Sequence, residues 1–137
     1  MDEVDKKLLE LLKHDARLSF VDLGSNVGLS EAAVRRRVKR LQELNIIKRF
    51  TIDIEVGQAA SALTLVAVAP STPTNDVSAR IKALPAVQRV YEITGQYDIA
   101  VLITGTNIAE VNGSIDQIRR ADGVATTNTI IILREIT

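Results

Sequence analysis

The sequence predicts an α+β protein, with an N-terminal winged helix-turn-helix followed by a ferredoxin-like βαββαβ domain. Three observations predict this fold class. Residues 1–45 hold three short segments of helical periodicity, and the following residues alternate strand and helix patterns. The charge balance changes from +3 in residues 1–50 to −3 in residues 51–137. We therefore expect two domains, at 1–56 and 61–137, joined by a linker at 57–60.

The composition narrows the chemistry that these domains can carry. The chain has 137 residues, of which 46% are hydrophobic and 3% aromatic, so the cores must be aliphatic. It has no cysteine and one histidine, which excludes disulfides, thiolate metal sites and multi-histidine metal sites. The N-terminal residues lack a signal-peptide pattern, and no apolar run reaches the roughly 20 residues of a membrane helix. We expect a cytoplasmic protein with no cofactor and no membrane partner.

The first two helices are marked by their caps. The first is predicted at 3–14, with Asp2 as its N-cap. For the second, Ser19 is the N-cap and Asp22 stands at the third helical position, a variant of the capping box. Gly28 follows the last turn, where a left-handed residue is expected.

The third helix begins almost at once, with Ser30 as its N-cap, and is predicted to run to about Leu44. The connection at 27–30 is short and contains glycine, which is typical of a helix-turn-helix. One side of this helix is apolar: Val34, Val38, Leu41 and Leu44. The opposite side carries Ala32, Arg35, Arg36, Lys39 and Glu43, with Arg40 beside them. Asn45 ends the helix, and the alternating residues 46–54 predict a small strand pair, the wing.

The third helix is the candidate DNA-binding element. Residues 30–49 contain seven basic and two acidic residues, and a major groove is wide enough for one helix. Its early residues would approach base edges, and the later cations would contact phosphates. The candidate DNA contacts are Ser30, Ala32, Arg35, Arg36, Lys39, Arg40, Lys48 and Arg49. A solvated basic face on a bundle helix is the alternative. Arg37, at the edge of the apolar side, fits core packing as well as DNA contact.

The second half predicts strands at 63–69, 87–94, 99–104 and 124–136. A helix capped by Thr74 or Asn75 follows the first strand, and a helix with a capping box from Asn107 to Glu110 follows the third. Gly123 ends that second helix. The resulting order is β-α-β-β-α-β.

Two polar segments in this half are candidates for ligand binding. Gly95-Gln96-Tyr97-Asp98 forms a turn in which Asp98 offers a carboxylate to an ammonium group. Thr126-Thr127-Asn128-Thr129 offers adjacent hydrogen-bonding side chains on the last strand. A plain hairpin turn and a plain sheet face are the alternatives. We find no catalytic set: His14 complements a helix dipole, and no phosphate-binding glycine loop is present.

In five segments the chain resembles the Lrp/AsnC family of transcription regulators. They are residues 2–9 (the opening helix), 15–19 (the first turn), 27–30 followed by 34–41 (the recognition helix), 45–50 (the wing) and 95–98 (the Gly-x-Tyr-Asp turn). The resemblance implies sequence-specific binding to double-stranded DNA. It also implies dimerisation through the sheet of the second domain, and assembly of dimers up to an octamer. Glu31-Ala32-Ala33 departs from the more polar start that is often seen in the family's recognition helix.

The resemblance also implies an amino-acid effector bound between dimers near the Gly-x-Tyr-Asp turn. The effector contacts carried over are Gly95, Gln96, Tyr97 and Asp98. Thr126, Thr127 and Asn128 are added by their position on the last strand. Two other functions fit the sequence less well. Haem-pathway decarboxylases of similar fold rely on histidines in the α+β half, but the one histidine here is His14. A protein-interaction module would not need the basic side of the third helix.

Overall fold

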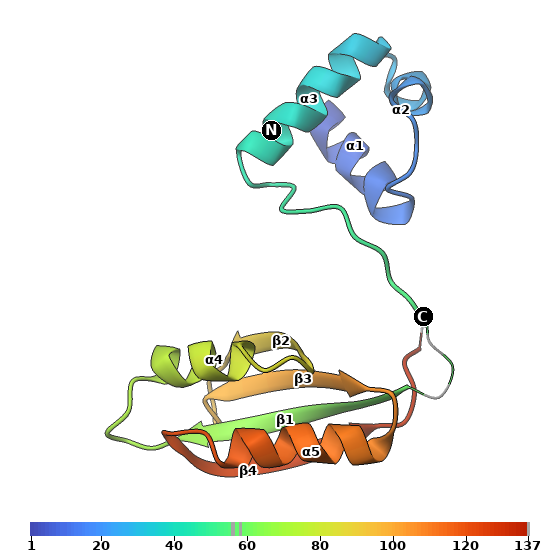
Figure 1. Cartoon of the computed structure of the whole chain (residues 1–137). Coiled ribbons are helices and arrows are strands. Elements are labelled where there is room, and N and C mark those ends of the chain that lie inside the picture. Colours follow the sequence, from blue (N-terminus) through green and yellow to red (C-terminus); the bar gives the residue numbers. More distant parts are fainter. Residues whose placement is uncertain (56, 58, 137) are drawn as a thin grey trace. The chain divides into compact units, whose positions relative to one another are not determined.

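The structure, a computed structural model, describes residues 1–55, 57 and 59–136, and it divides into two compact units, Met1–Ile54 and Glu55–Thr137 (Figure 1). Each unit is described by itself. The first contains helices α1 (Glu3–His14), α2 (Phe20–Val27) and α3 (Glu31–Glu43). No helix of the described residues is long and apolar enough to cross a membrane.

The N-caps of the three helices are those predicted, but among the described residues the Asp22 side chain makes no bond back to Ser19, so the capping-box variant predicted at α2 is only half present. Asp2 and Asp5 form a reciprocal capping box at the start of α1. The Ser19 and Ser30 hydroxyl oxygens accept N–H bonds from the third residues of α2 and α3, at 3.0 and 3.2 Å. Gly28 has a left-handed backbone, with φ +72°, so it reverses the chain between α2 and α3 without the steric cost of a Cβ atom.

The apolar sides of the three helices form one core. Its fully enclosed members are Leu8, Leu23, Val34 and Val38, and Leu41 is buried beside them. The prediction for Leu44 is wrong: this side chain is 57% exposed. Leu44 is the C-cap, and the left-handed Asn45 (φ 56°) turns the chain away directly after it.

The predicted wing is also wrong, because residues 46–55 form no strand. A strand pair needs a second segment that completes the hydrogen-bond ladder, and the described residues provide none here. The backbone N–H groups of Ile46 and Ile47 instead donate to the carbonyl oxygen of Leu41, at 2.9 and 3.0 Å. Ile52 is 77% exposed, so alternation in this segment does not reflect burial within the chain.

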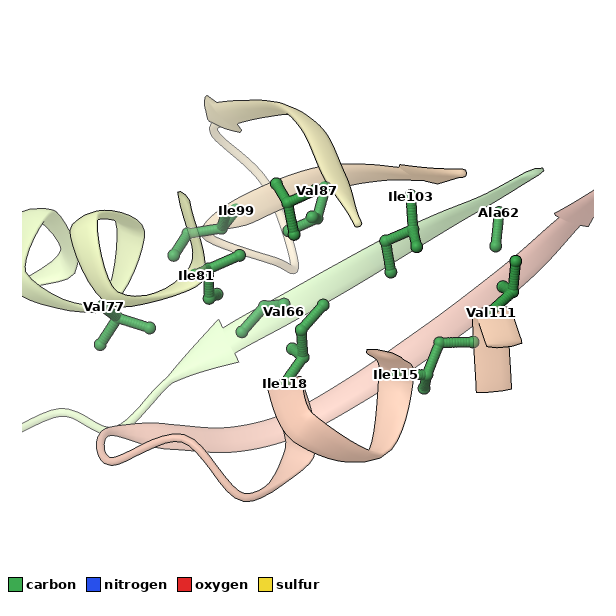
Figure 2. Close-up of a cluster of buried hydrophobic side chains, with 11 residues drawn as sticks. Ala62, Val66, Val77, Ile81, Val87, Ile99, Ile103, Val111, Ile115 and Ile118 are labelled. Atoms are coloured by element: carbon green, nitrogen blue, oxygen red, sulfur yellow. The ribbon is translucent and has the colours of Figure 1, made fainter. Parts of the chain in front are cut away.

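The second unit is a βαββαβ domain, as predicted. Its elements are β1 (Ala60–Val68), α4 (Thr74–Lys82), β2 (Val87–Glu92), β3 (Ile99–Gly105), α5 (Ile108–Arg119) and β4 (Val124–Ile132). The sheet order is β2-β3-β1-β4, and every neighbouring pair is antiparallel. Both helices contribute to one core with one face of the sheet (Figure 2), which includes Val77 and Ile81 of α4 and Ile115 of α5. Among the described residues of this unit, no helix packs against the other face of the sheet.

Several boundaries in this unit differ from the predictions. Strand β1 begins at Ala60, three residues earlier than predicted, and β4 ends at Ile132, four residues earlier than predicted. Ile132 pairs with Ser61, the second residue of β1, so β4 ends where its partner strand begins. Neither Thr74 nor Asn75 caps α4: its N-cap is Pro73, with no side-chain cap bond. The prediction that Gly123 ends the second helix is imprecise, because Arg120 is the C-cap of α5.

Half of the capping box predicted at α5 is present. The Asn107 side chain accepts the Glu110 N–H at 2.9 Å. The Glu110 carboxylate, however, accepts the backbone N–H of Thr106 at 2.9 Å and also the Thr106 hydroxyl. These bonds lower the pKa of Glu110 from its ordinary value, and they fix the loop that leads from β3 into α5.

Candidate functional site

Helix α3 turns four basic side chains to solvent, with the exposed Glu43 on the same side. Val34, Val38 and Leu41 are buried, so the helix turns its remaining sides outward. We define the α3 cationic face as the exposed side chains Arg35, Arg36, Lys39 and Arg40. The candidates Ser30 and Ala32 are exposed at the start of the same helix, and Lys48 and Arg49 are exposed in the segment after it. The structure thus brings the six candidates of the helix and its cap onto one element, but assigns no regular structure to the last two.

Most cations of the α3 cationic face have no acidic partner among the described residues and can bind an external anion. Among the described residues, no side-chain hydrogen bond or ion pair involves Arg36, Lys39 or Arg40. Arg35 differs, because its Nη2 lies 2.6 Å from the Glu31 carboxylate and its Cζ lies 5.3 Å from the centroid of the Phe20 ring. The Glu31–Arg35 spacing of four residues is a helix-pair signal that the sequence analysis missed, whereas the contact with Phe20 of α2 has no sequence signal.

Arg37 belongs to the fold of the first unit and is not part of the α3 cationic face. Its Nη1 lies 2.7 Å from Asp2 Oδ2 and 3.0 Å from Asp5 Oδ1, and the Asp5 side chain is 8% exposed. The ion cluster therefore joins α3 to the N-terminal cap of α1. The hydrogen bond from Arg37, together with the Asp5 N–H, lowers the pKa of Asp2 from 3.8 to about 2.

Arg37→Ala is expected to make the first unit sensitive to acid at a higher pH. The pKa of Asp2 is lower in the folded chain than its ordinary value, so its stabilising effect is complete above pH 3.8 and is lost as the pH falls through about 2. Without Arg37, the folded-state pKa of Asp2 returns toward its ordinary value, so Asp2 stabilises the first unit less at neutral pH, and the less stable variant unfolds at a higher pH. Acid titration followed by circular dichroism measures the midpoint. Arg40→Ala, which removes an exposed cation from the same helix, is the control and should leave the midpoint in place.

The Gly95–Asp98 turn is held by its own backbone and by one carboxylate. Gly95 has φ +117°, a conformation that side chains resist. Asp98 Oδ2 accepts the Val68 N–H at 2.8 Å. The Asp98 N–H donates to Val66 O at 2.9 Å, and the Asp98 carbonyl accepts from Ile93 at 2.8 Å. Asp98 therefore ties the turn between β2 and β3 to the end of β1.

The structure brings only part of the predicted effector set together. Val66 and Ala67 of β1 pair with Thr127 and Thr126 of β4, so these threonines lie at the same end of the sheet as the turn, with β1 between them. Thr127 accepts a hydrogen bond from Arg119 of α5 at 3.3 Å, which places it on the helix-covered face. Thr126 and Asn128 alternate with it and project from the opposite face.

Two surface depressions of the described residues lie away from this turn. One, of about 460 Å³, lies between α5 and β4 and is lined by residues that include Asp116, Arg119 and Thr129. The other, of about 310 Å³, lies beside the start of β2 and is lined by Glu110 and Ser114 among others. Gly95, Gln96, Tyr97 and Asp98 line neither of these two depressions.

Comparison with protein families gives a match in each of the two units. A model of the AsnC-type helix-turn-helix domain matches residues 1–42. A model of the Lrp/AsnC ligand binding domain matches residues 61–137.

Relatives and solved structures match the chain over nearly its whole length. The HTH-type transcriptional regulator LysM of Saccharolobus solfataricus is 45% identical over 134 residues, covering 98% of this chain and 94% of the relative. The regulator FL11 of Pyrococcus furiosus is 32% identical, covering 98% and 90%. The structure of LrpC of B. subtilis has a TM-score of 0.84 at 28% identity, covering 100% and 97%. A transcriptional regulator of Neisseria meningitidis in complex with L-Met has a TM-score of 0.89 at 23% identity, covering 100% and 92%.

Proposed function

The chain belongs to the Lrp/AsnC family of transcription regulators, and we propose that it contacts double-stranded DNA through α3. The family and the named relatives are DNA-binding regulators and not enzymes. The observation that carries the proposal is the α3 cationic face, whose opposite side is buried in the helical core. Because its apolar side stays packed on the other two helices, α3 can insert its exposed side into a major groove as part of the folded unit.

The exposed residues of α3 divide by their position along the helix. Ser30, Ala32, Arg35 and Arg36 lie at its start, where a recognition helix reaches base edges. Lys39 and Arg40 lie farther along and, with Lys48 and Arg49, suit phosphate contacts. Such contacts fix the position of the protein but carry no sequence information directly.

Selection from a random duplex pool, followed by titration in KCl, tests this function. Each phosphate contact should lower the slope of log K against log[salt] by about 0.9, so four contacts give about −3.6 per protomer. Arg36→Ala should weaken binding to the selected site. Either no enriched sequence, or unchanged affinity of Arg36→Ala for the selected site, would contradict DNA reading by α3.

We further propose that the second unit responds to an amino acid held near the Gly95–Asp98 turn. The matched domain is named for ligand binding, and the related fold from Neisseria was solved with L-Met. Asp98 uses Oδ2 to accept the Val68 N–H, and among the described residues no hydrogen bond engages Oδ1. That oxygen and its charge are suited to an ammonium group. Neither of the two depressions described above includes the turn, and we infer that a second chain completes the site.

A thermal-shift screen against the common amino acids tests the effector, with Asp98→Asn in parallel. Asparagine keeps an oxygen that can accept the Val68 N–H but removes the charge. A ligand at 100 times its Kd should stabilise the protein by about 2.7 kcal/mol, and Asp98→Asn should lose that shift while retaining the unliganded Tm. The control is Asp116→Asn on α5, which should keep the shift. A shift that survives Asp98→Asn would place the ligand elsewhere.

The proposed second chain fits the face of the sheet that the helices leave open. This face carries Leu63 and Leu65 of β1, Leu102 of β3, Tyr91 of β2 and Ile130 of β4. Tyr91 and Ile130 are 49% and 50% exposed, and burial of such apolar area favours association. We propose a homodimer through this face, with further assembly up to an octamer. Sedimentation velocity should give a dimer or a multiple of it, and a monomer at micromolar concentration would contradict the proposal.

A further inference from the structure

Arg35 is held in place in a way that its neighbours on the α3 cationic face are not. Its Nη2 is 2.6 Å from Glu31 Oε1, one turn earlier on the same helix. Its guanidinium lies over the ring of Phe20, at 5.3 Å from the centroid. Phe20 is the first residue of α2 and is partly buried against the helical core. The position of Arg35 is thus set by two contacts on two different helices.

These two contacts leave most of the guanidinium free to bind. The group has five N–H donors in a planar fork, of which one is used by Glu31, and the Arg35 side chain is still 61% exposed. A restrained fork loses less conformational freedom on binding than a mobile one. The Glu31 carboxylate, which DNA phosphates would otherwise repel, is neutralised by the same ion pair.

We propose that Arg35 is the specificity-determining residue of α3, and that it reads a guanine base through the O6 and N7 atoms in the major groove. Arginine fits this pair of acceptors with two parallel hydrogen bonds, and Arg35 lies near the start of the helix, where base contacts are made. Glu31 and Phe20 are positioning residues that hold the fork. This inference rests on the proposed insertion of α3 into DNA and adds the base that is read and the residue that reads it.

The test measures base preference instead of affinity alone. On the duplex selected by the full-length wild-type protein, each guanine is replaced in turn by 7-deazaguanine, which lacks the N7 acceptor. At one guanine per half-site the wild type should lose affinity. Replacement of that G·C pair by another pair should cost about 5- to 150-fold, the range for a bidentate contact. In Arg35→Ala both penalties should disappear at that position only.

Matched variants separate reading from charge and from folding. Arg35→Lys keeps the charge but not the fork, so it should keep the salt dependence and lose the guanine preference. Glu31→Gln and Phe20→Leu should each reduce the preference by about two- to fivefold, the size of one exposed contact. Phe20→Leu retains an apolar side chain, and its Tm reports any loss of folding. Arg36→Ala and Lys39→Ala should lower the affinity but leave the preference at that guanine intact.

Each outcome decides a separate point. A guanine preference that survives in Arg35→Lys and Arg35→Ala would overturn the role of Arg35. Unchanged preference in both Glu31→Gln and Phe20→Leu would overturn their positioning role. If Arg35→Ala, Arg36→Ala and Lys39→Ala all bind every duplex like the wild type, the failure lies instead with the insertion of α3 itself.

Discussion

Gly24→Ala is expected to destabilise the helix-turn-helix strongly and to weaken DNA binding with it. Gly24 lies inside α2, and a Cβ atom at this position would stand 2.3 Å from the backbone oxygen of Leu29. The Gly24 carbonyl also accepts the Leu29 N–H at 3.0 Å. Since the obstructing atom is backbone, the clash can be relieved only if the turn between α2 and α3 opens.

The expected cost is large for so small a unit. Overpacking of a well-packed site costs about 1–3 kcal/mol, whereas a unit of this size has a total stability of about 3–8 kcal/mol. Thermal unfolding followed by circular dichroism should show loss or a marked decrease of the transition of the first unit. DNA affinity should fall in the same variant.

The matched control is Gly113→Ala in α5. This glycine is also helical, but a Cβ atom there meets nothing within 4 Å. Alanine is favoured over glycine in a helix by up to about 1 kcal/mol, so this variant should be as stable as the wild type or more so. Equal Tm values for Gly24→Ala and the wild type would contradict the close approach of α2 to Leu29.

Inversion of two charges on the α3 cationic face should nearly eliminate DNA binding without unfolding the protein. Arg36→Glu combined with Lys39→Glu removes two exposed cations that make no ion pair among the described residues. It also places two carboxylates where phosphates would lie. We expect a loss on the order of 100-fold at low salt and a shallower salt slope, because fewer counterions are released. Fluorescence anisotropy with a labelled duplex measures both quantities.

A charge-matched control distinguishes this surface from the net charge of the protein. Lys82→Glu combined with Arg120→Glu makes the same change in charge on the second unit, at exposed positions of α4 and at the C-cap of α5. Its affinity for DNA should stay within a few fold of the wild type. Equal losses in the two double variants would mean that overall charge, and no particular face of α3, governs binding.

The parts of the fold that the sequence predicted are those governed by local rules. Asp2, Ser19 and Ser30 cap helices because their side chains reach N–H groups three residues away. The βαββαβ order follows from periodicity in the same way. The prediction of a wing was wrong because a strand needs a partner strand, and the alternating pattern at 46–54 contains no information about that partner.

Some features of the candidate sites also follow from local sequence patterns, and others depend on the folded chain. The outward position of the α3 cationic face follows from helical periodicity once Val34 and Val38 are taken as buried. The partners of individual side chains do not. Arg37 finds Asp5 at a separation of 32 residues and Asp98 finds Val68 at 30, and only the folded chain brings these groups together. The tie between Asp98 and β1 gives that carboxylate a structural role that the motif alone did not indicate.

The insertion of α3 into the major groove can be measured directly, because the chain has no cysteine. Ala32→Cys then carries the single thiol of the protein, at an exposed position in the first turn of α3, and an iron chelate attached to it cleaves DNA nearby. We predict cuts confined to the major groove of the selected site, and no localised cuts from the same chelate on Asn75→Cys of α4. Diffuse cleavage from position 32, or localised cuts from position 75 alone, would contradict DNA recognition by α3.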